Sequence, residues 1–349
     1  MPIKQRTIDY VQDTRLLVAR AREFERRGAA AEALVAYDMA AAMLDGLPPG
    51  AFHADLYRWK GTLLRDLGET TDAACLLKRS LDVAHYVLYS HGVAHAQNAL
   101  ASIYHRRGDL ATARQLYGDA SLNAAAAGDQ RLYALVEQSL GTIAQVQGDL
   151  EGARVRYHMS LRTLRATGDD EGVSWALHKI GLLHIETGRY EEACQAFQQA
   201  EELANARGDK VLEARLALGR SIVKLAAGSV DEAGREHARA RSMTERRHER
   251  PLRAETLLVE AHLLHARGEL ESATVALEET RALAESSEDI LMLARTLVVL
   301  GDVWHERGER SRAYELWQEG LAGFTRLGAI RETEKLQQRL ASPGGGNER

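Results

Sequence analysis

A glycine recurs every 40 residues along the chain, eight times without interruption, at Gly28, Gly68, Gly108, Gly148, Gly188, Gly228, Gly268 and Gly308. An alanine follows each of these glycines after five residues, and a small residue follows after twelve. Nine residues after the glycine the side chain is large and apolar or aromatic in seven repeats, at Tyr37, Leu77, Tyr117, Tyr157, Phe197, Leu277 and Trp317. His237 takes this position in the remaining repeat. A fixed period of this length is typical of stacked repeats.

Each repeat is predicted to contain two α-helices. The glycine supplies the left-handed turn that ends the first helix. The alanine lets the second helix approach closely, and the large side chain one turn later fills the groove between them. A second glycine, found at Gly128, Gly168, Gly208 and Gly328, ends the second helix. Because Ala, Leu, Arg and Glu dominate and are good helix formers, we expect an all-α chain with eight helix–turn–helix units over residues 14–328.

The two ends of the chain differ from the repeats. Residues 1–13 are polar and are predicted to extend the first helix. Residues 329–341 form an amphipathic pattern with Ile330, Leu336 and Leu340 on the apolar side. We expect a capping helix there, because a stack of repeats needs a cover over its last open face. Residues 342–349 are rich in glycine and are predicted to be disordered.

The motif Leu300-Gly301-x2-Trp304, followed by Gly308 and Ala313-x3-Trp317, resembles the tetratricopeptide repeat pattern. Ile180-Gly181-x2-His184, with Gly188 and Ala193-x3-Phe197, resembles it more loosely. The sequence departs from the family in lacking the closing proline and in having a period longer than about 34 residues. The resemblance implies a right-handed α-solenoid that binds another protein or a peptide in its concave groove.

The resemblance also implies that the first helix of each unit lines this groove. The lining positions then change from basic to amide-rich to apolar along the chain. An apolar groove of this kind would bind a partner, unless tight winding of the solenoid covers it, and the sequence leaves both alternatives open. The predicted partner-binding residues are Arg58, Arg65, His95, Asn98, His105, Gln138, Gln145, Trp175, His178, Leu182, Ile185, Leu218, Ile222 and Leu225.

Composition and charge indicate where in the cell the protein acts and which classes of partner it binds. The net charge is −5 and the charged residues are interspersed, which does not favour nucleic-acid binding. No apolar leader and no run of about 18 apolar residues is present. We therefore expect a cytoplasmic protein without membrane or nucleic-acid partners. Its two cysteines, Cys75 and Cys194, are expected to be buried and unreactive.

No motif for catalysis or for a cofactor is found. The sequence has no glycine-rich phosphate loop, no His-Glu-x2-His and no Cys-x2-Cys. His91 with His95, and His262 with His265, share helix faces, but neither pair has a third ligand nearby in sequence, so no metal site is predicted. The leading hypothesis is a non-enzymatic scaffold or adaptor. The alternative is a peptide-responsive regulatory receptor of the bacterial signalling type, and the oligomeric state is left open.

Overall fold

The computed structural model describes residues 3–244 and 250–341, and every regular element in these residues is an α-helix. The prediction of an all-α solenoid of helix–turn–helix repeats is confirmed. The helices are α1 (Ile3–Arg26), α2 (Ala30–Leu44), α3 (Ala51–Leu67), α4 (Thr70–Tyr86), α5 (Ser90–Arg106), α6 (Leu110–Ala126), α7 (Gln130–Val146), α8 (Leu150–Ala166), α9 (Asp170–Glu186), α10 (Tyr190–Arg207), α11 (Lys210–Ala226), α12 (Val230–Thr244), α13 (Arg250–Ala266), α14 (Leu270–Ser286), α15 (Ile290–Glu306), α16 (Arg310–Arg326) and α17 (Ile330–Ala341).

The 40-residue register governs the packing inside each helix pair. All eight turn glycines have positive φ, and at Gly108 (φ 74°) the turn is closed by the N–H of Asp109, which donates to the carbonyl of Tyr104 at 2.9 Å. All eight alanines five residues later are completely buried. The large residues nine positions after the glycine are buried too, including His237, whose Nε2 lies 3.2 Å from the carbonyl oxygen of Thr256. His237 is therefore a core residue, and the predicted register is confirmed.

In four repeats a glycine inside the first helix, seven residues before the turn glycine, allows the two helices of a pair to touch. These glycines are Gly61, Gly141, Gly181 and Gly301. A Cβ atom at Gly181 would lie 2.2 Å from Cε1 of Phe197, and one at Gly141 would lie 2.7 Å from Cε1 of Tyr157. These distances are far shorter than van der Waals contact. The aromatic ring of the second helix thus packs directly on the backbone of the first, and only glycine fits beneath it.

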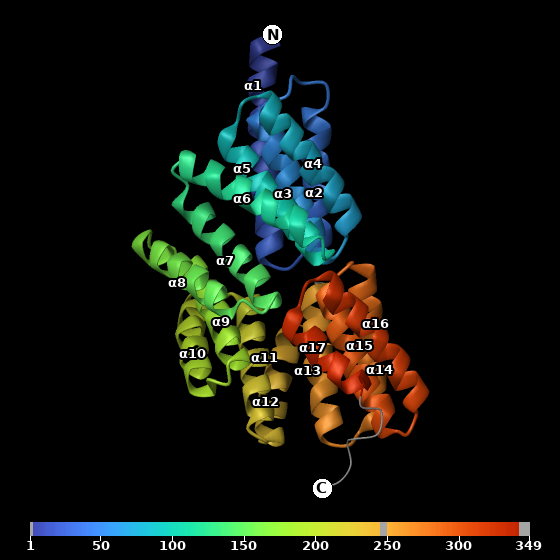
Figure 1. Cartoon of the computed structure of the whole chain (residues 1–349). Helices are drawn as coiled ribbons and strands as arrows, with labels where there is room; N and C mark the ends of the chain where they lie inside the picture. The colour runs from blue at the N-terminus through green and yellow to red at the C-terminus, as the bar shows by residue number, and fades with distance from the viewer. Residues whose placement is uncertain (1–2, 245–249, 342–349) are drawn as a thin grey trace.

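The helix pairs wind into a superhelix whose last repeats return to the first ones. Figure 1 shows α13–α17 beside the ends of α3–α6. Arg250 pairs with Glu69 at 2.9 Å, and Arg107 pairs with Glu288 at 2.5 Å. Arg326 donates to the carbonyl oxygen of Arg107 at 2.7 Å. We call these contacts, together with the hydrogen bonds from Thr70 and Thr71 to Glu288, the seam. The seam closes the superhelix around an inner space.

Helix α17 covers the apolar side of the last helix pair. Leu336 is buried in a core shared by α5–α7 and α15–α17. Arg331 donates to Glu186 at 3.3 Å, and Arg339 forms an ion pair with Asp302. The segment predicted as a cap is thus held by α15 and, across the superhelix, by α9. The predicted disordered tail, residues 342–349, lies outside the described residues.

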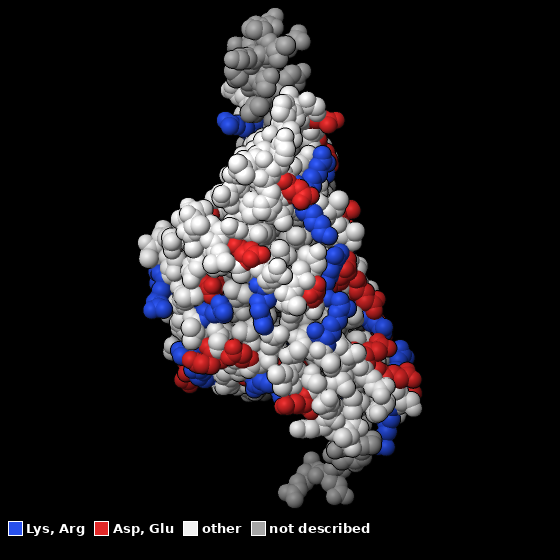
Figure 2. Space-filling model, turned by 45° about the horizontal axis from the view of Figure 1, so that its top comes forward, with Lys and Arg blue, Asp and Glu red and all other residues white. Residues whose placement is uncertain are grey.

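The surface shows two further points about the predictions. No helix in the described ranges is long and apolar enough to cross a membrane. Cys75 is exposed and Cys194 is only partly buried, so the prediction of two buried thiols is wrong. The side chain of Cys75 is exposed because Ala73 and Leu77 of α4 occupy the inward-facing positions of that helix, which turns Cys75 outward. On the face shown in Figure 2, Lys and Arg alternate with Asp and Glu.

Two residues other than glycine have positive φ in the described part of the chain, and they make a matched pair. Leu88 (φ 55°) and Glu288 (φ 52°) stand where other repeats have their second glycine. Leu88 is 88% exposed, so Leu88→Gly should remove strain without losing contacts. We expect it to stabilise the protein by about 0.5–1 kcal/mol, since the left-handed conformation costs more than the extra freedom that glycine has in the unfolded chain.

Glu288→Gly should relieve the same strain but delete the seam contacts of Glu288. Each of those hydrogen bonds contributes about 0.5–1.5 kcal/mol, and all are partly exposed. We expect a net loss of about 1 kcal/mol in the free energy of unfolding, measured by urea denaturation. Equal stabilisation by both glycine variants would mean that the seam contributes nothing.

Candidate binding surface

The concave side of the superhelix contains two adjoining cavities, which we call the lumen. The larger has a volume of about 630 Å³ and the smaller about 300 Å³, and Trp175 of α9 lines both. The larger cavity is lined by charged and aromatic side chains of both signs, namely Arg22, Glu25, Arg58, Trp59, Arg65, Asp66, Arg106, Glu171, Trp175, Asp209 and Arg215. The smaller cavity is lined by Asn98, His105, Leu135, Gln138, Ser139, Thr142, Trp175 and Lys179. The lumen is therefore formed by the first helices of the repeats, as the resemblance implied.

Arginine side chains hold the two tryptophans of the lumen in place. The guanidinium of Arg58 lies 5.4 Å from the ring centre of Trp59, and that of Arg22 lies 5.7 Å from it. Arg215 lies 5.3 Å from the ring centre of Trp175. Cation–π contacts of this kind fix the ring orientation. The tryptophan faces are thus preorganised apolar surfaces inside a charged cavity.

Four of the lumen's arginines form ion pairs with carboxylates of the chain. These pairs are Arg22 with Glu25 at 3.8 Å, Arg58 with Asp55 at 2.8 Å, Arg65 with Asp66 at 2.7 Å, and Arg215 with Glu255 at 2.9 Å. Lys179 and Arg106 differ from them. Within residues 3–244 and 250–341, neither has a carboxylate oxygen within 4.0 Å. Arg106 donates to the carbonyl oxygen of Arg65 at 2.9 Å.

The pKa values of the lumen reflect burial among positive charges. Burial, together with Arg215, lowers the pKa of Lys179 to about 8. Burial lowers the pKa of Arg106 as well. Burial, with a smaller effect from Lys179, lowers the pKa of His105 to about 4, so this imidazole is neutral at pH 7. Glu255 near Lys179, and Asp289 and Asp66 near Arg106, offset the effect of burial on these pKa values only in part. A carboxylate entering the lumen would therefore be attracted to both cations.

Several predicted residues lie together in the lumen. Arg58, Arg65 and Trp175 line the larger cavity, and Asn98, His105 and Gln138 line the smaller one with Trp175. Gln138, however, is only 6% exposed, and its amide donates to Oγ of Ser160 at 3.0 Å.

Other predicted polar residues are engaged within the chain. Gln145 accepts a hydrogen bond from the hydroxyl of Tyr157 at 2.9 Å and donates to Glu186 at 2.7 Å. His95 lies against a carboxylate, as described below. His178 is 5% exposed and packs edge-on against Trp175, with ring centres 5.8 Å apart. Burial lowers the pKa of His178, so it is a neutral side chain beneath the lumen surface.

The predicted apolar groove is largely covered. Leu218 is 4% exposed and lies in the core formed by α11–α13, so the expectation that it is accessible is wrong. Leu182 and Ile185 pack against the core of α7–α11, and Ile222 and Leu225 pack against the core of α11–α13. None of the five lines either cavity of the lumen. The cause is tight winding, which brings neighbouring first helices into contact at these positions.

Sequence reasoning missed Trp59, Arg106 and Lys179. Each directly follows a predicted lining residue, namely Arg58, His105 and His178. Successive residues of an α-helix are separated by about 100° around its axis. On each of these helices, the surface that lines the lumen therefore also includes the residue that directly follows the predicted lining position. A search for basic or aromatic residues next to the lining positions would have found all three.

Comparison with known proteins agrees with the repeat architecture. Tetratricopeptide repeat models match residues 130–206 and 93–121. These matches identify tetratricopeptide repeats in the middle of the chain. No match was found among curated proteins.

Solved structures with a similar fold include regulators and assembly proteins. One is the Rap conjugation gene regulator of the plasmid pLS20 in complex with the Phr* peptide (TM-score 0.65, 14% identity, covering 82% of this chain and 79% of that chain). Another is a Rap protein complexed with competence and sporulation factor (TM-score 0.59, 13% identity, 95% and 97%). The APC/C hetero-tetramer Cut9–Hcn1 is also similar (TM-score 0.61, 15% identity, 94% and 55%). At these identities the likeness concerns the fold.

Proposed function

We propose that this protein binds a peptide, or an extended segment of another protein, inside the lumen, and that the bound segment carries a carboxylate at one end. The observation that carries the proposal is the placement of Lys179 and Arg106, two partly buried cations without an ion pair among the described residues. A buried charge is costly unless it is paired. A ligand carboxylate would supply the missing charge.

The other lumen residues support a peptide as the occupant. Trp59 and Trp175 offer fixed aromatic faces, which are frequent anchors for a bound apolar side chain. Asn98 and Thr142 offer donors and acceptors for a peptide main chain. The cavity volumes fall in the range of about 300–1,000 Å³ that is usual for ligand pockets. The occupant is thus a short segment rather than a whole domain.

A peptide-responsive regulator is the second candidate, and the seam favours it. The lumen lies inside a superhelix whose first and last turns are joined by surface ion pairs and hydrogen bonds. A ligand that fits the open and closed forms unequally would shift the balance between them. The Phr* peptide in complex with the Rap conjugation gene regulator is consistent with this mode. Small-angle scattering distinguishes the candidates, because a scaffold keeps its radius of gyration on binding whereas a regulator of this type changes it.

The charge of Lys179 gives the sharpest test of lumen binding. Peptides selected from a random display library on the wild-type protein should be enriched in acidic residues. Lys179→Glu should weaken their binding by at least about 30-fold, since reversing one partner of an occluded charge pair costs about 2 kcal/mol or more. Lys78→Glu is the matched control, because Lys78 is exposed on α4 away from the lumen, and it should leave the affinity unchanged. Equal binding by both variants in fluorescence anisotropy would place the peptide elsewhere.

Binding should also depend on pH. Since the pKa of Lys179 is about 8, its positive charge is present at pH 7 and is progressively lost as the pH rises above 8. Affinity of wild-type protein for an acidic peptide should therefore fall between about pH 7 and pH 9, whereas Lys179→Arg should keep it, because a guanidinium stays charged. Identical pH profiles would rule out Lys179 as the group that pairs with the ligand.

A further inference from the structure

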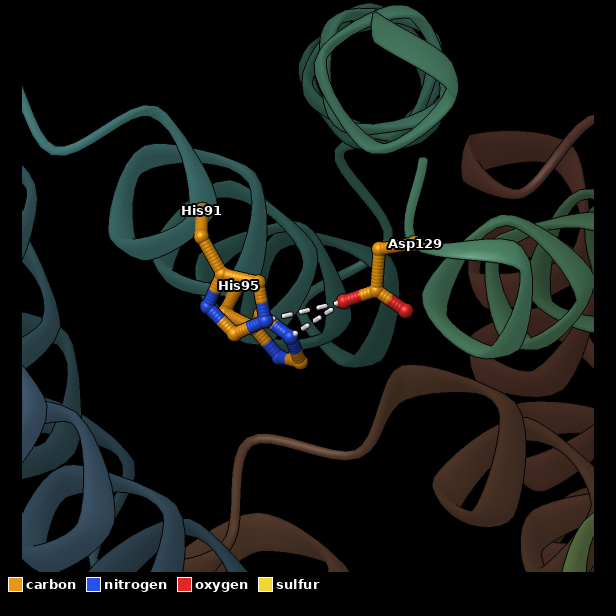
Figure 3. Close-up of side chains that lie close together, drawn as sticks. All are labelled: His91, His95 and Asp129. Atoms are coloured by element: carbon orange, nitrogen blue, oxygen red, sulfur yellow. Dashed lines mark hydrogen bonds and ion pairs between the residues drawn. The ribbon is translucent and has the colours of Figure 1, made fainter. Parts of the chain in front are cut away.

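Two histidines and one aspartate from neighbouring repeats converge at the start of α5. His91 and His95 lie one turn apart on α5, and Asp129 lies in the turn between α6 and α7 (Figure 3). Nε2 of each histidine is 3.0 Å from Oδ2 of Asp129, and the two ring centres are 4.3 Å apart. The three ligand atoms all lie within 4.8 Å of one another. The sequence showed the histidine pair but not its third member, which stacking of the repeats supplies.

The equivalent positions one repeat later show that histidine is not needed to join the repeats. There, Arg131 takes the place of His91 and pairs with Asp169, the equivalent of Asp129, at 2.7 Å. An arginine–carboxylate pair is thus sufficient to join adjacent repeats at this position. The third repeat instead presents two imidazoles to one carboxylate, which is a set of metal ligands.

Further contacts orient the three side chains. The hydroxyl of Tyr89 lies 3.3 Å from Nδ1 of His91 and donates to Asp55 at 3.2 Å, so Nε2 of His91 is turned toward Asp129. Oδ1 of Asp129 accepts the N–H of Leu132 at 2.9 Å and caps α7, which leaves Oδ2 for the histidines. Outer contacts of this kind fix ligand geometry in metal sites.

We propose that His91, His95 and Asp129 bind a zinc ion that fastens the third repeat to the fourth. Imidazole nitrogen and carboxylate oxygen are ordinary zinc ligands with bonds of about 2.0–2.1 Å. In a tetrahedron with such bonds, neighbouring ligand atoms lie about 3.3 Å apart, close to the 3.0 Å between each Nε2 and Oδ2. The fourth position is left to water. The site lies outside the lumen cavities and is independent of peptide binding.

Metal binding can be tested on the full chain after chelator treatment. Zinc titrated by calorimetry should bind with one equivalent per chain, and cobalt should give the visible absorption bands of a tetrahedral site. Asp129→Asn keeps the helix cap, because asparagine is an equally good capping residue. It should nevertheless weaken binding by more than about 100-fold, since loss even of an outer contact costs about 10–100-fold. His95→Ala should do the same.

Two further variants separate metal binding from folding. His91→Arg recreates the Arg131–Asp169 arrangement, so it should fold with an unchanged melting temperature in chelator while losing the cobalt bands and the zinc-induced rise in melting temperature. His265→Ala removes a histidine that also lies 2.8 Å from a carboxylate, that of Glu306, but belongs to no three-ligand group in the described residues. It should leave metal binding intact. Absence of cobalt bands in the wild-type protein, or bands that persist in His91→Arg and Asp129→Asn, would overturn the proposal.

Discussion

Gly181→Ala is expected to lower the free energy of unfolding by about 1–3 kcal/mol, the range for overpacking a well-filled core. The new methyl group would lie 2.2 Å from Cε1 of Phe197. Phe197 is fully buried in the core of α7–α11, and its ring also packs on Gly219 of α11, where a Cβ atom would lie 2.6 Å from Cζ. Relief therefore requires that α10 move away from α9, which also disturbs the buried Ala193. Urea or guanidinium denaturation followed by circular dichroism measures the change.

Gly118→Ala is the matched control for this substitution. Gly118 also lies within a helix, α6, but a Cβ atom there meets nothing within 4 Å. Alanine is a better helix former than glycine by about 0.5–1 kcal/mol, so this variant should be more stable than wild type. If both variants change stability in the same direction, helix propensity rather than the contact between the paired helices decides the outcome.

Leu218→Ala is expected to destabilise the protein by about 2–5 kcal/mol, as is usual when a buried leucine is truncated and leaves a cavity. Leu218 is 4% exposed and packs in one core with Ala214, Leu252 and Val259 from α11 and α13. The sequence had suggested that it contacts a partner, in which case truncation would weaken binding and leave stability unchanged. The structure reverses this expectation.

Leu122→Ala controls for loss of a leucine as such. Leu122 is 73% exposed on α6, and its truncation should change stability by no more than about 0.5 kcal/mol. Thermal and chemical denaturation of the two variants should therefore separate clearly. A Leu218→Ala variant as stable as Leu122→Ala would show that Leu218 is accessible and would restore the apolar groove as a binding surface.

The sequence predicted the parts of the fold that repeat. Gly148, Ala153 and Tyr157 stand in a fixed spacing, and each has one local role. The glycine ends a helix, the alanine allows close approach, and the tyrosine fills the groove. These roles depend on residues within the same helix pair, so periodicity reveals them. The buried alanines and the order of the helices followed from this spacing.

The sequence could not predict what depends on winding. The rotation from one repeat to the next is small and accumulates, so contacts between distant repeats do not follow from any local pattern. Arg107 and Glu288 meet across 181 residues, and Asp129 reaches His95 across 34. The same winding buried Leu218 and turned Lys179 toward the lumen. The binding surface was therefore predicted only in part, because the two cations Arg106 and Lys179 that line the lumen were missed.

The seam has a consequence for how this chain loses its structure. In an open array each unit touches only its neighbours, so the terminal units have fewer contacts and fray independently of the middle. Here α13–α17 also rest on repeats near the beginning of the chain through Glu69 and Arg107, and on α9 in the middle of the chain through Glu186. Their fraying would have to break these long-range contacts together. We therefore expect the repeats to unfold cooperatively, as in a closed ring. Unfolding of the last repeats would remove the contacts that they make with the first ones, and the reverse is also true.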